Sequence, residues 1–257
     1  MKKLSVKEIQ NIQLNILKEV ADFCDKFNIK YFLGCGTLCG AVVRKSFFPW
    51  DDDIDILMPR KDYEKFLAIF QSKKLKLLTC NNKDYYYPYA KVVHSKTIAF
   101  ECKNHIADYG VFIDVFPIDG APNKLYLYLL KPLKYLMMSK WGCHLDKRNI
   151  FVKIIYKIVS IITIPIPNNY FARLLNKICR KYSLENCKKS GVIVHYRKNK
   201  EIVSSSIFDK RKKFIFEGSE FYGPKMYDEY LKALYDNYYE EDNHDYNKHF
   251  VAYWKKE

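Results

Sequence analysis

The sequence has little glycine and few acidic residues, and it lacks a long apolar run. Only 9 of its 257 residues are glycine, which disfavours a loop-rich all-β design. Because 49% of the residues are hydrophobic and 16% are aromatic, intrinsic disorder is excluded and the chain must bury a core. Three of the few glycines nevertheless cluster, at Gly34, Gly36 and Gly40. This cluster is the first indication of a functional site.

Basic residues outnumber acidic residues in the chain as a whole. The 29 Asp and Glu residues stand against 44 Lys and Arg residues, so the formal net charge is +15. One hypothesis from this charge is a non-catalytic module that binds nucleic acid or a membrane surface. However, the basic residues are spread along the chain, and the acidic run at 51–53 would repel nucleic-acid phosphates. We therefore expect no nucleic-acid partner.

No segment reaches the roughly 18 uninterrupted apolar residues of a membrane span. The nearest is 150–167, which Lys153 and Lys157 interrupt. Together with the apolar stretch 125–138 it predicts either helices that make peripheral contact with a membrane or helices that pack on the protein's own core. The eight cysteines are scattered, and no apolar leader follows Met1. We therefore expect reduced thiols and a cytoplasmic location, either free or peripheral at the inner face of the membrane.

The hydrophobic periodicity predicts an α+β fold, with a mixed β-sheet core, flanking helices and a helical C-terminal part. Strands are expected at about 31–34, 53–58, 75–79, 89–94, 97–101 and 110–116. Helices are expected at about 5–27, 37–43, from Pro59 onward, and at 124–140, 150–164, 168–183 and 225–238. This order predicts a catalytic core over 1–122 and a mostly helical part over 123–257 that completes the site and lies toward the acceptor and the membrane.

The aspartate residues near the glycine cluster predict a metal site. Four of the five residues in 51–55 are Asp, and their mutual repulsion calls for a counter-charge, most economically Mg²⁺ or Mn²⁺ with oxygen ligands. Alternation along a strand places Asp53 and Asp55 on one face. Asp114 lies on a later strand and shares a face with Phe112 and Phe116. We predict that the three aspartates are the catalytic and metal-binding residues, with one metal ion or a pair about 4 Å apart.

A phosphate site is predicted next to these carboxylates. Gly36 and Thr37 lie at a strand-to-helix junction, where free backbone N–H groups at a helix N-terminus bind anions. Phosphate-binding and metal-binding groups so close in sequence indicate a nucleotidyltransferase-type site.

Three motifs carry a resemblance to a known family. They are GTLCG at 36–40 followed by FFPWDDDID at 47–55, GVFIDVFPIDG at 110–120, and FEG at 216–218. In this order they resemble the signatures of the LicD family of phosphocholine transferases, which is related to fukutin and to the nucleotidyltransferase-fold superfamily. The resemblance implies that Asp53 and Asp55 are the metal pair and that Gly36 and Thr37 form the phosphate turn. It also implies that Asp114 is a third carboxylate, either a base for the acceptor hydroxyl or a metal ligand.

The implied reaction moves phosphocholine from CDP-choline, or a related CDP-activated donor, to a sugar hydroxyl, and releases CMP. The acceptor would be a cell-surface glycan of the lipopolysaccharide or teichoic acid type, either free or lipid-linked. Two alternatives stay open: transfer of glycerol phosphate or ribitol phosphate, and transfer of a nucleotide to a small acceptor with release of pyrophosphate.

Further residues are candidates for substrate contacts. Lys91 falls on the family's lysine-containing strand and could contact phosphate. Arg44 stands where the family commonly has histidine, and His249 resembles the family's final histidine. Trp50, with the tyrosines at 85–87 and 89, could surround a trimethylammonium group through cation–π attraction, although core packing is the competing interpretation.

Overall fold

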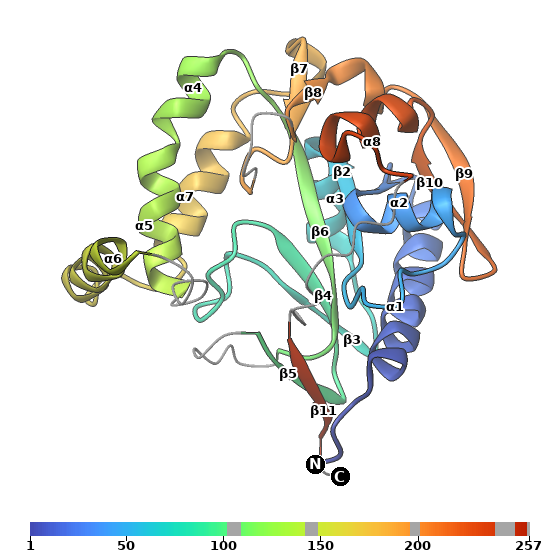
Figure 1. Ribbon diagram of the computed structural model, residues 1–257, viewed down its shortest axis with the longest axis horizontal. Coiled ribbons are helices and arrows are strands. Elements are labelled where there is room, and N and C mark those ends of the chain that lie inside the picture. Colours follow the sequence, from blue (N-terminus) through green and yellow to red (C-terminus); the bar gives the residue numbers. More distant parts are fainter. Residues whose placement is uncertain (102–108, 142–148, 196–200, 240–249, 256–257) are drawn as a thin grey trace.

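A mixed β-sheet forms the centre of the molecule (Figure 1). The computed structural model describes residues 1–101, 109–141, 149–195, 201–239 and 250–255. The strand order is β1 (Phe32–Leu33), β2 (Asp55–Pro59), β6 (Phe112–Gly120), β4 (Ala90–His94) and β3 (Leu75–Leu78). Strands β2 and β6 are parallel, and the other pairs along this path are antiparallel. The predicted α+β class with a mixed sheet is confirmed.

Two helices cover one face of the sheet. Helix α1 (Val6–Lys26) begins at a capping box in which Ser5 and Glu8 satisfy each other's backbone N–H groups. Helix α3 (Arg60–Ile69) follows β2 directly. Both helices contact β6, and they meet each other where the rings of Phe23 and Phe66 lie 6.0 Å apart. Helices α1 and α3 therefore pack on the same face of the sheet.

The register across the central strands aligns three charged residues in one row. Asp55 on β2 is the direct neighbour of Asp114 on β6, and Asp114 is the direct neighbour of Lys91 on β4. Direct neighbours on adjacent strands point to the same face of a sheet. The fold thus brings together residues from three distant parts of the sequence.

A further layer of helices lies along one side of the molecule (Figure 1). Its members are α4 (Lys124–Leu129), α5 (Lys131–Trp141), α6 (Ile150–Ile162) and α7 (Tyr170–Cys179). The single helix expected over 124–140 is two helices, which part at Leu130. Pro132 explains the break, because proline lacks an N–H and its ring clashes with the carbonyl four residues earlier.

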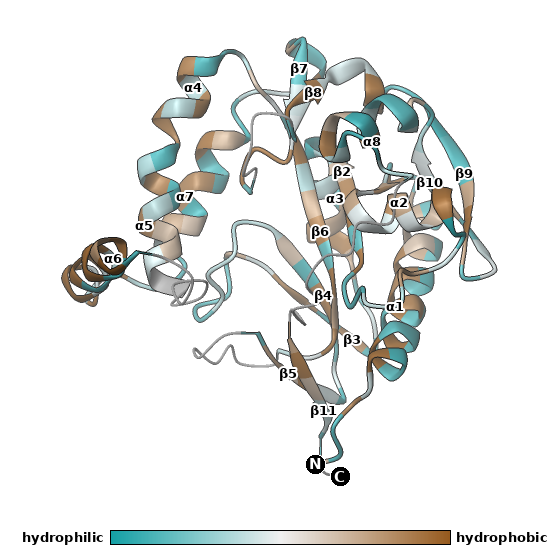
Figure 2. Cartoon of the chain, in the orientation of Figure 1, coloured by the Kyte–Doolittle hydropathy of each residue, from teal (hydrophilic) through white to brown (hydrophobic). Residues whose placement is uncertain are grey.

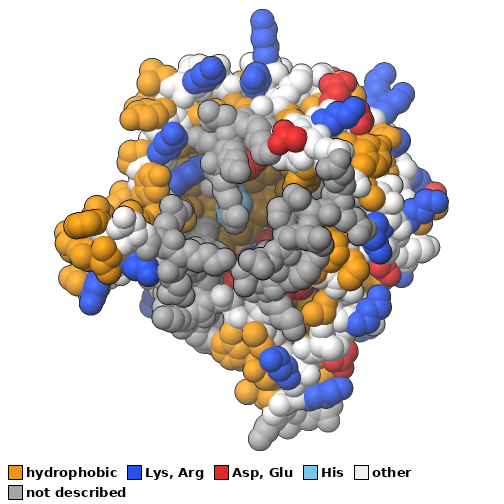
Figure 3. Space-filling model, viewed as in Figure 1, with side chains coloured by type: hydrophobic (Ala, Val, Ile, Leu, Met, Phe, Trp, Pro, Cys, Tyr) orange, Lys and Arg blue, Asp and Glu red, His pale blue; other side chains and the backbone are white. Residues whose placement is uncertain are grey.

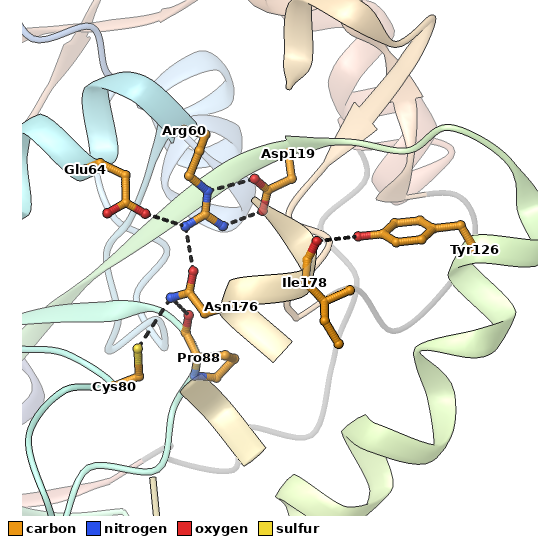
Figure 4. Close-up of polar contacts among 8 residues, drawn as sticks. All are labelled: Arg60, Glu64, Cys80, Pro88, Asp119, Tyr126, Asn176 and Ile178. Atoms are coloured by element: carbon orange, nitrogen blue, oxygen red, sulfur yellow. Dashed lines mark hydrogen bonds and ion pairs between the residues drawn. The ribbon is translucent and has the colours of Figure 1, made fainter. Parts of the chain in front are cut away.

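A buried ion pair joins this helical layer to the sheet (Figure 4). The guanidinium of Arg60 on α3 donates two hydrogen bonds to the carboxylate of Asp119 on β6, at 2.7 and 2.5 Å. It donates a third, of 2.7 Å, to Asn176 Oδ1 on α7. The same three residues therefore connect α3, β6 and α7.

The C-terminal part contains strands as well as helices, which the periodicity did not predict. They are β7 (Lys189–Gly191), β8 (Val203–Ser204), β9 (Arg211–Phe216), β10 (Ser219–Pro224) and β11 (Val251–Trp254), and the last described helix is α8 (Tyr227–Tyr235). Strand β7 pairs with the end of β6, and β11 pairs with β5 (Thr97–Phe100). Segments beyond residue 122 thus add to sheets begun before it, and the division of the chain at 122 stays a prediction.

Candidate active site

A cavity of about 380 Å³ lies over the row of charged residues. All three predicted aspartates, Asp53, Asp55 and Asp114, line it. Phe112 and Phe116 also line it, so the predicted face of β6 is confirmed. Two further carboxylates, Glu101 and Glu201, line the same cavity. Five carboxylates around one cavity make this the candidate active site.

Lys91 is an internal counter-ion in this structure. Its side chain is 1% exposed, and its Nζ lies 2.6 Å from Asp114 Oδ1 and 4.0 Å from Glu101 Oε2. The ammonium group also lies 3.5 Å from the ring centroid of Phe112, which is a cation–π distance. The structure thus places the charge of Lys91 against Asp114, and its contact with phosphate stays a prediction.

Glu101 is a site residue that sequence reasoning missed. It directly follows β5, and its carboxylate accepts hydrogen bonds from the hydroxyl groups of Tyr87, at 2.6 Å, and Tyr109. No motif in the sequence indicates Glu101, because it meets the other carboxylates only through tertiary packing. His195 and Glu201 also line the cavity and were likewise missed.

Burial and mutual repulsion perturb the carboxylates. Burial raises the pKa of Asp55 well above its usual range, and the charges of Asp53 and Asp114 raise it further. Burial raises the pKa of Asp114 to about 7, although the ammonium of Lys91 opposes that shift. A cation bound next to these carboxylates would favour their charged form and reduce their mutual repulsion. The carboxylate oxygens that line this cavity are donors that suit a hard divalent ion.

The carboxylates are not preassembled into a metal cage. Within the parts of the chain that the structure describes, no three or more His, Cys, Asp or Glu side chains are gathered as a metal-binding group. This arrangement fits Mg²⁺, which often takes only one or two carboxylates and completes its shell with substrate phosphates and water. Metal binding by Asp53, Asp55 and Asp114 stays a prediction.

Thr37 positions Asp55 in this structure. Its side chain is 2% exposed, and its Oγ1 accepts a 2.9 Å hydrogen bond from the backbone N–H of Asp55. Gly34 N–H donates to the backbone oxygen of Asp55, also at 2.9 Å. A Cβ at Gly36 would lie 3.3 Å from Asp51 Oδ2. The glycine-threonine turn thus lies beside the aspartate loop, and its binding of phosphate stays a prediction.

Two glutamines of α1 donate hydrogen bonds to the backbone of the aspartate loop. No sequence motif indicates them. Gln10 Nε2 donates to the backbone oxygen of Asp51 at 2.8 Å. Gln13 Nε2 donates to the backbone oxygens of Asp52, at 2.7 Å, and Phe112, at 3.0 Å. Because Gln13 is fully buried, it ties the loop to β6 at a defined position.

Two of the remaining predicted contacts, Arg44 and Trp50, are not part of the cavity lining. Arg44 is exposed at the end of α2 (Cys35–Val43), and Trp50 stacks on Phe48 with ring centroids 5.3 Å apart. Neither is among the described residues that line the cavity. His249 lies outside the described residues. Of the predicted tyrosine group, Tyr87 and Tyr89 line the cavity.

A mixed sheet that places neighbouring carboxylates from β2 and β6 in one cavity, beside a glycine-threonine turn, is the arrangement expected of a nucleotidyltransferase-type site. Residues 28–130 match the family model described as LicD/FKTN/FKRP, nucleotidyltransferase domain. This segment contains Asp53, Asp55, Lys91 and Asp114.

Two curated proteins are similar to this chain. The first is the lipopolysaccharide cholinephosphotransferase LicD of Haemophilus influenzae, which is 28% identical over 259 residues that cover 93% of this chain and 92% of that protein. The second is an uncharacterized protein of Rickettsia typhi, 34% identical over 87 residues that cover 33% of this chain and 28% of that protein. The first likeness extends through the C-terminal part, beyond the residues that the family model matches.

Proposed function

We propose that this protein is a cholinephosphotransferase, which moves phosphocholine from CDP-choline to a sugar hydroxyl of a cell-surface glycan and releases CMP. The observation that carries the proposal is the pairing of Asp55 with Asp114 on parallel strands, with Asp53 at the same cavity. The likeness to the Haemophilus influenzae protein along 93% of the chain supports phosphocholine as the transferred group and a lipopolysaccharide-type glycan as the acceptor.

Each carboxylate has a distinct task in the proposal. Asp53 and Asp55 bind a divalent ion, Mg²⁺ or Mn²⁺, which when bound neutralises charge on the donor diphosphate and on the departing CMP. Thr37 holds the backbone of Asp55, and Gln13 holds that of Asp52. The loop is therefore positioned before the donor arrives, so little ordering remains to be done during the reaction.

Asp114 has two candidate roles that an experiment separates. As a base, it accepts the proton of the acceptor hydroxyl when the oxygen attacks phosphorus. As a ligand, it completes the metal shell. Asp114→Asn should leave the affinity for Mn²⁺ unchanged and lower kcat in the first case, and should weaken Mn²⁺ binding in the second.

The wall of the cavity favours a choline group over a neutral polyol. Besides its carboxylates, the cavity is lined by aromatic rings, namely those of Tyr87, Tyr89, Phe112, Phe116, Phe208, Tyr230 and Tyr235. A quaternary ammonium binds aromatic faces through cation–π attraction of about 0.5–2 kcal/mol, and the carboxylates supply opposite charge. Glycerol phosphate and ribitol phosphate carry no cation for such a wall to bind.

The test is release of CMP by the purified protein from CDP-choline, with Mg²⁺ and a lipopolysaccharide-type or teichoic acid-type acceptor preparation. We expect Asp53→Asn and Asp55→Asn each to lower the rate by at least about 100-fold, because each removes a charged metal ligand. Asp84→Asn is the matched control, since Asp84 is exposed and lies away from the cavity lining; it should keep full activity.

Other outcomes would replace the proposal. CMP release from CDP-glycerol or CDP-ribitol, with none from CDP-choline, would show that a different phospho-group is moved. Release of pyrophosphate from a nucleoside triphosphate would identify a nucleotidyltransferase that acts on a small acceptor.

A further inference from the structure

Helix α6 presents an apolar stripe to solvent. Phe151, Ile155, Ile158 and Ile162 follow one another at intervals of four, three and four residues, which places them on one helix face. They are 72%, 59%, 51% and 68% exposed, respectively. Tyr156 on the opposite face is buried and contacts Tyr135 of α5, with ring centroids 6.4 Å apart. The helix thus attaches to the protein by its less apolar side.

Exposed apolar side chains occur elsewhere in the helical layer as well. Figure 2 shows α6 as one of the most hydrophobic helices, and Figure 3 shows hydrophobic side chains gathered where it projects from the molecule. On α4, which lies along the same side (Figure 1), Leu125, Tyr128 and Leu129 are 64%, 63% and 65% exposed. Scattered single apolar residues are normal on a protein surface, whereas a concentration of this kind marks a contact surface.

The same part of the chain carries most of the excess positive charge. Residues 121–184, which span α4 to α7, hold twelve Lys and Arg residues and a single acidic residue, Asp146. This segment therefore contributes +11 of the formal net charge of +15. The rest of the chain is close to neutral, so the excess charge is concentrated in this segment of the sequence.

A second cavity is lined by both lysine side chains and exposed apolar side chains of α4. It has a volume of about 930 Å³ and lies between α4 and the start of β7. Five lysines line it, namely Lys124, Lys131, Lys181, Lys188 and Lys189. Among the described residues that line it, none is Asp or Glu, and the exposed Leu125 and Tyr128 form part of its wall. Such a basic cavity suits a phosphate group.

We propose that the helical layer of residues 121–184 docks on an anionic phospholipid bilayer. The stripe on α6 enters the interface between headgroups and acyl chains, as amphipathic helices with basic flanks do, and the lysine-lined cavity binds headgroup phosphate. Within the described residues, no helix has both the length and the apolar content needed to cross a bilayer, so the contact is peripheral. A second copy of this chain fits less well, because two surfaces with this excess of positive charge would repel each other.

The experiment is co-sedimentation of the full chain with phospholipid vesicles. One set contains phosphatidylcholine alone, and the other contains phosphatidylcholine with phosphatidylglycerol. We expect strong binding to the second set, weak binding to the first, and a loss of affinity as salt is raised. Equal binding to both sets, or binding to neither, would overturn the proposal.

Matched single substitutions assign the binding surface. Ile155→Asp should weaken binding by at least about 100-fold. It removes an apolar side chain that the bilayer would bury, and it adds a negative charge that anionic lipids repel. Ile215→Asp is the control, since Ile215 is 47% exposed on β9, outside the helical layer; it should bind as the wild type does. Both positions are exposed, so both variants should fold, which circular dichroism verifies. Binding by Ile155→Asp equal to that of the wild type would refute the role of α6.

Two further measurements separate this proposal from its rivals. A solution dimer that Ile155→Asp dissociates, without vesicle binding by the wild type, would assign the stripe to self-association. Asp55→Asn should bind vesicles normally, because Asp55 lies in the other cavity. A failure of the proposed enzymatic activity would therefore leave the vesicle result unaffected.

Discussion

The buried pair of Arg60 and Asp119 should be a major determinant of stability. Asp119 is 0% exposed and Arg60 is 7% exposed. Two hydrogen bonds join the side chains (Figure 4). Burial raises the pKa of Asp119, and the adjacent guanidinium opposes that shift. Asp119→Asn keeps the shape of the side chain but leaves the buried charge of Arg60 with only the half-exposed Glu64 as a counter-ion.

The expected magnitude follows from this geometry. Removal of one partner of a buried ion pair costs about 3–5 kcal/mol, against a typical total of about 5–15 kcal/mol for a domain. The double variant Arg60→Met/Asp119→Leu buries no lone charge. Its main loss is the hydrogen bond to Asn176 Oδ1, and an unsatisfied buried acceptor costs about 1–3 kcal/mol. The double variant should therefore be more stable than Asp119→Asn.

Urea unfolding, followed by circular dichroism, gives the free energy of unfolding of each variant. The control is Glu64→Gln, because Glu64 is the outer partner of Arg60, with a side chain 45% exposed; its loss should cost less than about 1 kcal/mol. A cost below about 1 kcal/mol for Asp119→Asn, or a double variant less stable than Asp119→Asn, would refute the reasoning.

Two other predictions concern single side chains. Burial lowers the pKa of Lys134 from 10.5 to about 7, so above pH 7 the unfolded chain binds a proton that the folded chain does not. Stability should therefore rise between about pH 7 and pH 9, by at most about 1.4 kcal/mol per pH unit. In urea unfolding, Lys134→Met should flatten this slope and Lys131→Met should not. Thr37→Val leaves the buried N–H of Asp55 without its acceptor and should cost about 1–3 kcal/mol. It should also lower the rate of CMP release, and Thr37→Ser should restore both; an unchanged stability would show that the hydrogen bond is unimportant.

Local patterns predicted most of the elements and the acidic side of the site. Alternation along β6 correctly placed Phe112, Asp114 and Phe116 on one face, because the period of a strand is a local property. The β9–β10 hairpin was missed, although its signal was present. Glu217 and Gly218 both have positive φ angles, 48° and 72°, in a two-residue connection, and glycine in such a turn between alternating residues is a hairpin signal.

Periodicity and motif order in the sequence determined that Asp53, Asp55 and Asp114 lie on or beside strands, and that residues 28–130 are similar to the LicD family. Only the tertiary structure decided what surrounds them. In the structure, Asp55 pairs with Asp114, and Lys91 is a buried counter-ion. Three residues that the sequence did not indicate also line the same cavity, namely Glu101, His195 and Glu201. Such contacts join residues far apart in the chain, and their register depends on the packing of the whole sheet. The exposure of the α6 stripe was also visible only in the tertiary structure. An apolar helix face has the same sequence pattern whether it packs on a core or contacts a membrane.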